Sequence, residues 1–135
     1  MKATKTSLIL TLVAAATCYG QHFYGPSGSF NGSSRTSGNT TRYYDSIGRH
    51  VGTAEKSGNV TRFYDSRGSY QGSSTESGGN TRYYDSRGSF RGSSSRSGSE
   101  TRYYDSRGSY RGSASESGGT TRYYDSRGSY QGSKR

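Results

Sequence analysis

A phrase of 20 residues recurs along nearly the whole chain without a single insertion or deletion. The aromatic residue that opens its central pair stands at Phe23, Tyr43, Phe63, Tyr83, Tyr103 and Tyr123. A fixed period of this kind is typical of repeat architectures, in which each copy forms the same supersecondary unit. The first copy is degraded and the last ends early, as expected of capping units. We therefore expect one repeat domain over residues 21–135, with units that start near residues 22, 42, 62, 82, 102 and 122.

Two turn signals alternate within each unit. The first is Asp-Ser-x-Gly, as at residues 65–68, which favours a type I turn closed by a left-handed glycine. The second is Ser-Gly-Asn or Ser-Gly-Gly, as at residues 37–39 and 77–79. The runs between them are rich in Thr and Tyr and favour strands. The predicted fold class is all-β, with six hairpin repeats. The residues expected to form the Asp-Ser-x-Gly turns are Asp45, Gly48, Asp65, Gly68, Asp85, Gly88, Asp105, Gly108, Asp125 and Gly128.

The core of such a fold has to be aromatic, because few aliphatic side chains remain after residue 21. The bulged turn places Tyr64 opposite Tyr70, and equivalent aromatic pairs recur in the other units. We expect this doubly aromatic face to be the core. Its members are Tyr44, Tyr64, Tyr70, Tyr84, Phe90, Tyr104, Tyr110, Tyr124 and Tyr130.

The other face of each predicted hairpin combines aromatic and basic side chains. In the simplest register Phe63 lies opposite Gln71, and Arg62 lies opposite Gly72. We expect this face to be half exposed and to form a candidate binding surface. Its members are Arg62, Arg82, Arg102, Arg122, Tyr43, Phe63, Tyr83, Tyr103 and Tyr123.

Two arrangements of the folded units fit this pattern. Consecutive hairpins can form a meander that stays open or closes on itself, and the strong Asp-Ser-x-Gly turn favours this arrangement. Alternatively, each unit can be one coil of a β-solenoid, which the constant repeat length favours. Disorder is a third alternative, because hydrophobic residues make up 25% of the chain and 21 residues are Gly. The strict phase of the aromatics argues against disorder.

The first 20 residues have the features of a cleaved secretory signal peptide. Lys2 and Lys5 precede an apolar run from Leu8 to Ala16, and small residues follow. We expect cleavage after Gly20, with Ala16 as the alternative site. Cys18 raises a lipoprotein alternative, but the sequence before it lacks the usual leucine. We expect an exported protein, periplasmic, cell-surface or secreted, with no transmembrane segment after signal removal.

The chain is strongly basic, with a net charge of +10. Without Lys2 and Lys5, 17 basic residues face 9 acidic ones, which leaves +8. This charge favours anionic surfaces such as acidic polysaccharides. An alternative is that the arginines keep a repetitive sheet soluble. Tyrosines spaced by arginines also suit nucleic acid, although export argues against that partner.

No constellation in the sequence suggests catalysis. Each full unit has one Asp in its turn, usually with an Arg two residues later, which favours a turn cap over a calcium ligand. His22 and His50 stand in unlike positions of their units. Asn31, Asn39 and Asn59 begin glycosylation sequons, which matter only in a eukaryotic source. We expect a non-enzyme with no metal site and no cofactor.

The stretch at residues 83–88, Tyr-Tyr-Asp-Ser-Arg-Gly, resembles the hairpin phrase of choline-binding and glucan-binding cell-wall repeats. That resemblance implies hairpin repeats and a ligand held between aromatics of adjacent units, although this chain has no Trp. The chain also resembles small exported bacterial proteins of unknown function with TTRYYDSxGxxxG units. Together these features predict a structural or adhesive protein of the cell envelope that contacts anionic glycans. The alternatives are a self-assembling fibre or matrix and a nucleic-acid-binding protein.

Overall fold

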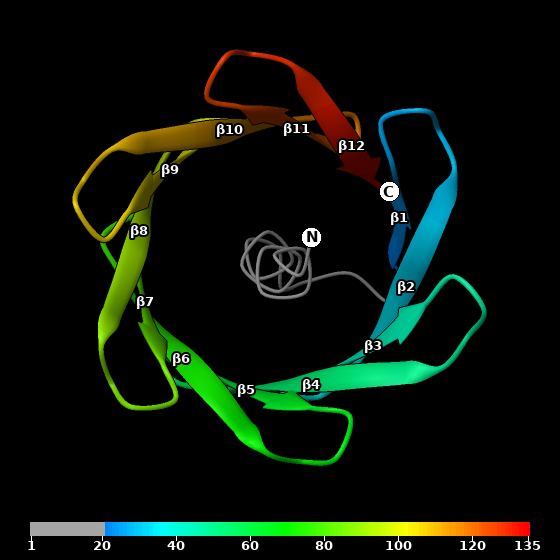
Figure 1. Cartoon of the computed structure of the whole chain (residues 1–135), viewed down its shortest axis with the longest axis vertical. Coiled ribbons are helices and arrows are strands. Elements are labelled where there is room, and N and C mark those ends of the chain that lie inside the picture. Colours follow the sequence, from blue (N-terminus) through cyan, green and yellow to red (C-terminus); the bar gives the residue numbers. More distant parts are fainter. Residues whose placement is uncertain (1–20) are drawn as a thin grey trace.

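The computed structural model describes residues 21–135, which form a closed barrel of twelve antiparallel strands (Figure 1). The predicted signal peptide, residues 1–20, lies outside the described residues. Within residues 21–135 the structure contains no helix that could cross a membrane. The strands are β1 (Gln21–Tyr24), β2 (Phe30–Ser37), β3 (Thr40–Asp45), β4 (His50–Ser57), β5 (Val60–Asp65), β6 (Tyr70–Ser77), β7 (Asn80–Asp85), β8 (Phe90–Ser97), β9 (Glu100–Asp105), β10 (Tyr110–Ser117), β11 (Thr120–Asp125) and β12 (Tyr130–Lys134).

The strands follow one another around the ring in chain order. Each pairs with the strand before it and the strand after it, and β1 pairs with β12 to close the sheet. In Figure 1 the colours accordingly run once around the barrel until the first and last strands meet. The all-β prediction is confirmed, and the meander is the correct arrangement. The solenoid alternative is wrong, because equivalent strands of successive units lie two positions apart and share no ladder.

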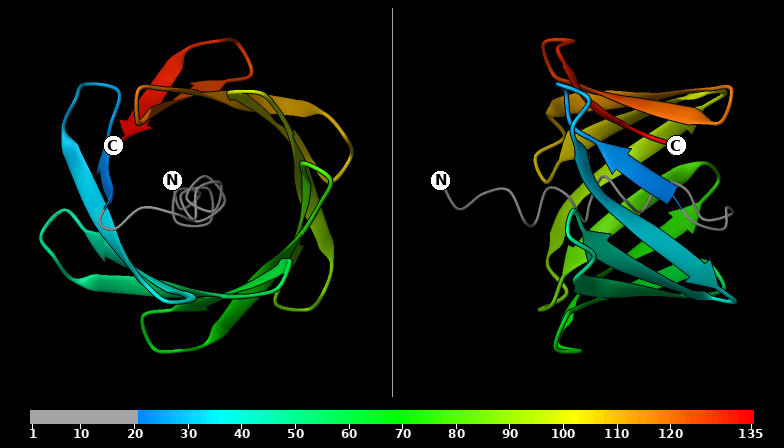
Figure 2. Two further views of the ribbon diagram at one scale, coloured as in Figure 1. Left: turned by 180° about the vertical axis from the view of Figure 1, so that it is seen from behind. Right: turned by 90° about the vertical axis from the view of Figure 1, so that its right-hand side faces the viewer.

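The Asp-Ser-x-Gly turn forms as predicted. The Gly68 amide donates to the Asp65 carbonyl at 3.1 Å, the Asp65 amide donates to the Ser69 carbonyl at 3.0 Å, and Gly68 has φ of 83°. The Asp65 carboxylate accepts from the Arg67 and Ser69 amides, at 2.9 Å each. The five Asp-Ser-x-Gly turns and the equivalent Gly25–Ser29 turn of the first unit join odd-numbered to even-numbered strands, so all six lie at one end of the barrel and the Ser-Gly turns lie at the other (Figure 2).

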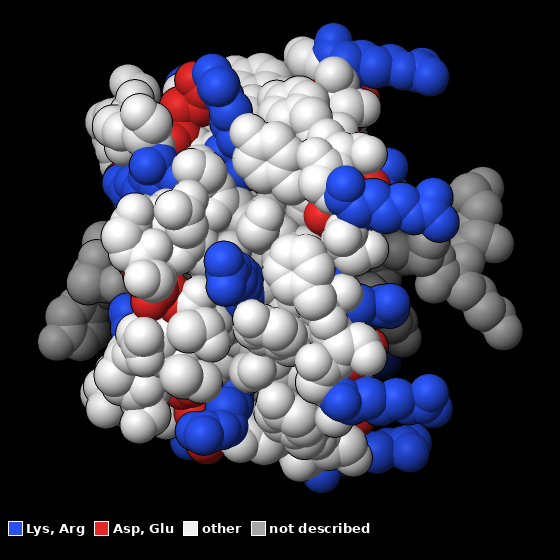
Figure 3. Space-filling model, turned by 90° about the vertical axis from the view of Figure 1, so that its left-hand side faces the viewer, with Lys and Arg blue, Asp and Glu red and all other residues white. Residues whose placement is uncertain are grey.

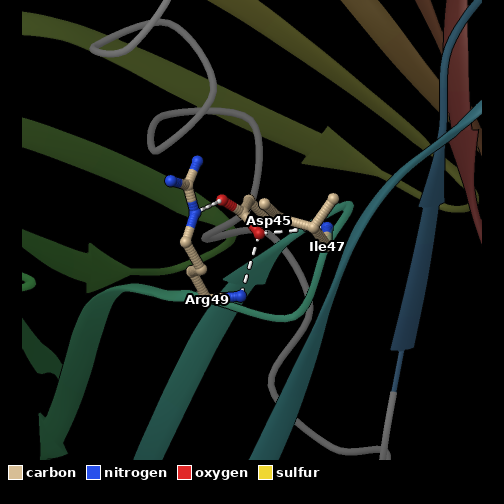
Figure 4. Close-up of polar contacts among 3 residues, drawn as sticks. All are labelled: Asp45, Ile47 and Arg49. Atoms are coloured by element: carbon tan, nitrogen blue, oxygen red, sulfur yellow. Dashed lines mark hydrogen bonds and ion pairs between the residues drawn. The ribbon is translucent and has the colours of Figure 1, made fainter.

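Backbone donors stabilise the charged form of three of the turn aspartates, Asp45, Asp85 and Asp105. Hydrogen bonds from the backbone, the largest from Ser89, lower the pKa of Asp85 despite partial desolvation. In the second unit, Asp45 accepts from the amides of Ile47 and Arg49, and the Arg49 guanidinium donates to its other oxygen at 2.8 Å (Figure 4). The aspartates therefore serve the turns, as the sequence predicted.

A bulge beyond the turn changes the predicted register. Tyr64 does pair with Tyr70, but the ladder shifts between Phe63 and Tyr64. As a result Phe63 pairs with Gly72, whereas the simple register placed Gln71 there. Arg62 correspondingly lies opposite a serine rather than a glycine. The same shift occurs in every hairpin closed by this turn.

Because of the bulge, each inner ring lies opposite a glycine. These single rings face the inside of the barrel, whereas the prediction placed the paired aromatics there. Phe63 is 7% exposed and Tyr83 is 3% exposed, whereas Tyr70 is 40% exposed. A sheet that closes into a ring has less room inside than outside, so single rings opposite Gly, Ser or Ala fit the inner face. The predicted core residues lie instead on the outer face, and this correction applies to Tyr44, Tyr64, Tyr70, Tyr84, Phe90, Tyr104, Tyr110, Tyr124 and Tyr130.

The pKa values of the inner tyrosines report the same burial. Desolvation raises the pKa of Tyr43 to about 12 and also raises the pKa of Tyr103 and Tyr123. Tyr43 also contributes to the raised pKa of Tyr123, although the first unit lies between their two units in the ring. The raised pKa values show that the inner tyrosine hydroxyls are shielded from solvent.

One phenol of the inner face lacks the hydroxyl partner that its neighbour has. Tyr83 hydrogen-bonds Ser94 at 3.1 Å between the two hydroxyl oxygens, and Ser94 lies 11 residues later. The equivalent position for Tyr103 is Ala114, and the buried Tyr103 hydroxyl has no hydrogen-bond partner within residues 21–135. The repeat therefore supplies an internal comparison of a satisfied and an unsatisfied tyrosine.

We expect two single substitutions, at the equivalent repeat positions Ser94 and Ala114, to change the free energy of unfolding in opposite directions. Ser94→Ala removes the hydrogen bond between the Ser94 and Tyr83 hydroxyls, which leaves Thr81 as the other partner, and should lower the free energy of unfolding by about 0.5–1.5 kcal/mol. Ala114→Ser gives Tyr103 a partner and should raise it by about 0.5–1.5 kcal/mol. Urea denaturation followed by circular dichroism measures both, with Ser93→Ala as a control that stays within about 0.5 kcal/mol. Equal signs for the two inner substitutions would contradict this account of the hydrogen bond.

The seam between β1 and β12 is the shortest pairing in the ring. Its ladder comprises Phe23↔Lys134 and Tyr24↔Ser133, extended by the reciprocal backbone bonds of His22 and Arg135 at 2.8 and 2.9 Å. The Arg135 guanidinium carbon lies 5.3 Å from the Tyr24 ring centroid, in cation–π range. Because this seam closes the sheet, residues 21–135 present no unpaired edge strand.

Candidate anion-binding surface

Five equivalent arginines lie around the outer face of the barrel, and we call them the outer belt. Side chains two residues apart on a strand share a face, so each arginine lies beside the outer tyrosine of its own strand. Equivalent strands are two positions apart in the ring, which spaces these arginines by about 10 Å perpendicular to the strands. All five are exposed, and Figure 3 shows basic side chains set among uncharged surface. The outer belt comprises Arg42, Arg62, Arg82, Arg102 and Arg122.

Edge-on aromatic pairs accompany the outer belt. In the third unit the ring centroids of Tyr64 and Tyr70 are 5.9 Å apart and their planes are inclined by 61°. The same edge-on pair occurs in each of the other five units. Such pairs contribute roughly 0.5–1.5 kcal/mol beyond their buried area. The second ring of the pair is 38–42% exposed where it is Phe or Tyr, so it keeps apolar surface toward solvent.

Most of the belt charge is uncompensated. Arg102 donates to the Glu100 carboxylate at 2.9 Å, and this hydrogen bond is the main cause of the raised pKa of Arg102. The other four belt arginines form no ion pair within residues 21–135. Exposed guanidinium groups without an acidic partner can bind carboxylate, sulfate or phosphate oxygens through paired N–H donors.

The acidic residues concentrate at the two ends of the barrel. At the Ser-Gly end, Arg96 pairs with Glu116 at 3.1 Å and Lys56 approaches Glu76 at 3.9 Å. At the other end the turn aspartates bind backbone amides, and some of them also bind arginines, such as Arg91 at 3.8 Å from Asp85. The belt arginines therefore lie between these two ends, and Glu55 is the acidic residue that faces one of them directly.

Both histidines belong to this outer face. His22 stands in the first unit where the later units have the belt arginine, and its ring lies 5.8 Å from the Phe30 ring. His50 replaces the second aromatic of its pair, and its Nε2 lies 3.1 Å from the Thr53 hydroxyl. Residues 21–135 contain no cluster of three or more His, Cys, Asp or Glu residues arranged to hold a metal ion.

The structure separates the residues predicted for the binding surface into two sets. The four predicted arginines are exposed on the outer face, and their binding role stays a prediction. The rings predicted beside them line the inner face, so that part of the prediction is wrong for Tyr43, Phe63, Tyr83, Tyr103 and Tyr123. The aromatics that do flank the arginines are the edge-on pairs, because the bulge leaves those pairs on the belt side. Arg42 was missed, although the repeat alignment places it in the same position.

Comparisons with known proteins add no relative to this description. No family model, no curated protein and no solved structure matches the chain.

Proposed function

We propose that this protein is an exported, non-enzymatic barrel that binds anionic polysaccharide at the cell envelope through its outer belt. A structural or adhesive role follows from such binding. The observation that supports the proposal is the ring of exposed arginines, spaced by about 10 Å and flanked by partly exposed aromatic pairs. The arginines supply paired donors for acidic groups, and the rings supply apolar surface for the C–H faces of sugars.

Repetition favours a polymeric partner over a small one. A single exposed ion pair contributes little in water, typically about 0–1 kcal/mol. Several equivalent sites on one rigid scaffold raise the overall affinity once a first group has bound, because each later contact is intramolecular. A polyanion long enough to reach successive arginines gains this advantage, whereas a monosaccharide does not.

A sulfated polysaccharide and polygalacturonate are suitable probes, with neutral dextran as the uncharged reference. The test variant replaces Arg62, Arg82, Arg102 and Arg122 by Ser. We expect its affinity for both polyanions to fall by about a hundredfold or more at low salt, since exposed charge pairs of about 1 kcal/mol each combine. Isothermal titration at several salt concentrations measures the loss and the accompanying decrease in salt dependence.

A second quadruple variant provides the control because it removes the same charge from a different place. Arg67, Arg87, Arg107 and Arg127 are exposed at the turn ends, away from the belt, and their replacement by Ser lowers the net charge equally. We expect this variant to keep most of the affinity. Equal losses in the two variants would mean that net charge alone drives binding, and an undiminished belt variant would refute the proposal.

Nucleic acid is the second candidate partner, since arginines between aromatic rings also suit bases and phosphates. A single-stranded oligonucleotide of mixed sequence, titrated beside the polysaccharides, separates the two. Tighter binding of the oligonucleotide at equal salt would favour nucleic acid. Self-assembly through free sheet edges, the other alternative from the sequence, finds no unpaired edge strand within residues 21–135.

A further inference from the structure

One junction between units places two arginines directly opposite each other on the outer face. Each belt arginine faces a residue of the preceding strand across the Ser-Gly hairpin, and in four of the five junctions that residue is uncharged or acidic. In the junction of β2 and β3 it is Arg35, which faces Arg42. The facing pairs are Arg35↔Arg42, Glu55↔Arg62, Thr75↔Arg82, Ser95↔Arg102 and Ser115↔Arg122.

The Arg35–Arg42 pair carries an unrelieved repulsion. Directly opposed side chains in an antiparallel pair have Cβ atoms roughly 4.5–5.5 Å apart, and like charges at this distance destabilise the sheet. Both side chains are exposed, and neither forms an ion pair within residues 21–135. The chain therefore presents two positive charges side by side where its other units avoid them.

The surrounding residues offer these two arginines little compensation. Asp45 is the one acid in strands β1 to β3, and it is held by the amides of its turn and by Arg49 (Figure 4). Glu55 of β4 faces Thr40 on one side and Arg62 on the other, so it is only diagonal to Arg42. On the other side of β2 lies strand β1, where His22 is opposite Ser33 on the same outer face.

We propose that Arg35 and Arg42 together bind one tetrahedral dianion, such as inorganic phosphate, inorganic sulfate or a phosphate monoester. Each guanidinium presents a planar fork of N–H donors, and two forks from adjacent strands can share the oxygens of one tetrahedral group. A dianion neutralises both charges at once, whereas a carboxylate neutralises one. The inference deepens the proposed function by naming a phosphate monoester, which carries two negative charges when ionised, as the anchoring group of a bound polymer, but the site itself does not depend on a polymer.

Thermal unfolding in different sodium salts of equal ionic strength tests the site. The probes are inorganic phosphate, sulfate and acetate, each compared with chloride. Arg35→Ser reproduces the facing serine of two other junctions, and Arg67→Ser is the control because Arg67 is an exposed turn-end arginine outside the outer belt whose hydrogen bond to Asp65 uses only its backbone amide. Titration calorimetry with inorganic phosphate then gives the affinity directly.

We expect Arg35→Ser to raise the melting temperature in chloride, because it removes the repulsion. The unmodified protein should gain melting temperature in phosphate and sulfate beyond its gain in acetate, as ligand binding to the folded state requires. Arg35→Ser should lose this gain and bind phosphate at least tenfold more weakly, while Arg67→Ser should keep both the gain and the affinity. Sulfate and phosphate also stabilise proteins nonspecifically, so the part of the gain that Arg35→Ser removes is the measure of the site.

Two results would overturn the inference. If Arg35→Ser keeps the full gain in phosphate and sulfate, the stabilisation is a general salt effect. If acetate stabilises the unmodified protein as strongly as phosphate does, the site does not select a tetrahedral dianion. The quadruple belt variant retains Arg35 and Arg42, so it separates this inference from the proposed function: polysaccharide binding should fall while the gain in phosphate remains.

Discussion

Gly72→Ala is expected to prevent the barrel from folding. A Cβ atom at Gly72 would lie 2.2 Å from the carbonyl oxygen of Tyr84, on the neighbouring strand. The obstacle is backbone, so it can move only if the ladder between the two strands opens. Gly72 also has φ of +143°, a conformation that other residues rarely adopt. The two effects together should remove more than about 3 kcal/mol of stability, and the variant should have the circular dichroism spectrum of an unfolded chain.

Two other glycines provide graded controls for this prediction. Gly68 has φ of +83° but no atom near the added Cβ, so Gly68→Ala should cost about 1–2 kcal/mol from backbone strain alone. Gly52 is not in the left-handed region and its Cβ would lie 2.7 Å from the Tyr64 carbonyl oxygen, so an intermediate loss is expected. If Gly72→Ala unfolds at the same urea concentration as Gly68→Ala, the close approach of the neighbouring strand is not the reason that position 72 requires glycine.

Removal of residues 131–135 is expected to open the ring and change the oligomeric state. These residues carry the whole β12 side of the seam, including the reciprocal backbone bonds between His22 and Arg135. Without them β1 keeps one neighbour, β2, and its free edge becomes a template for pairing with another molecule. We expect soluble oligomers or aggregates in light scattering and fast amide exchange in β1.

Arg135→Ala is the matched control for the truncation. It removes the cation–π contact with Tyr24 and keeps the backbone bonds of the seam. We expect this variant to stay closed, with a loss of about 0.5–1 kcal/mol. A truncated chain that remains monomeric at the original melting temperature would show that the seam does not hold the barrel together.

The sequence predicted the features of this fold that are decided within a few residues. The turn at Asp65 depends on a carboxylate and a glycine three positions apart, and it forms as expected. The bulge between Phe63 and Tyr64 was not predicted, because both the bulged and the regular register satisfy the same turn. Closure of the ring could not be derived either, since each hairpin pairs locally in an open or a closed meander.

The choice of inner face was wrong for a related reason. Both faces of the hairpin carry aromatics, so alternation alone does not say which side is buried. The available signal was side-chain size: Gly72 and Ser74 lie on the face of Phe63, and small neighbours suit the crowded inner side of a curved sheet. For the candidate site, the arginines could be predicted from the repeat, whereas the placement of Arg35 opposite Arg42 required the register across the Ser-Gly hairpin.

The organisation of one hairpin per repeat has a consequence for how the chain can change in length. An antiparallel ring closes with every neighbour correctly oriented only if it contains an even number of strands. Because the 20-residue unit contributes two strands, duplication or loss of a whole unit preserves this parity. Insertion of a single strand would force two parallel neighbours somewhere in the ring. Barrels of ten or fourteen strands are therefore accessible to this chain by unit exchange, each with one belt arginine fewer or more.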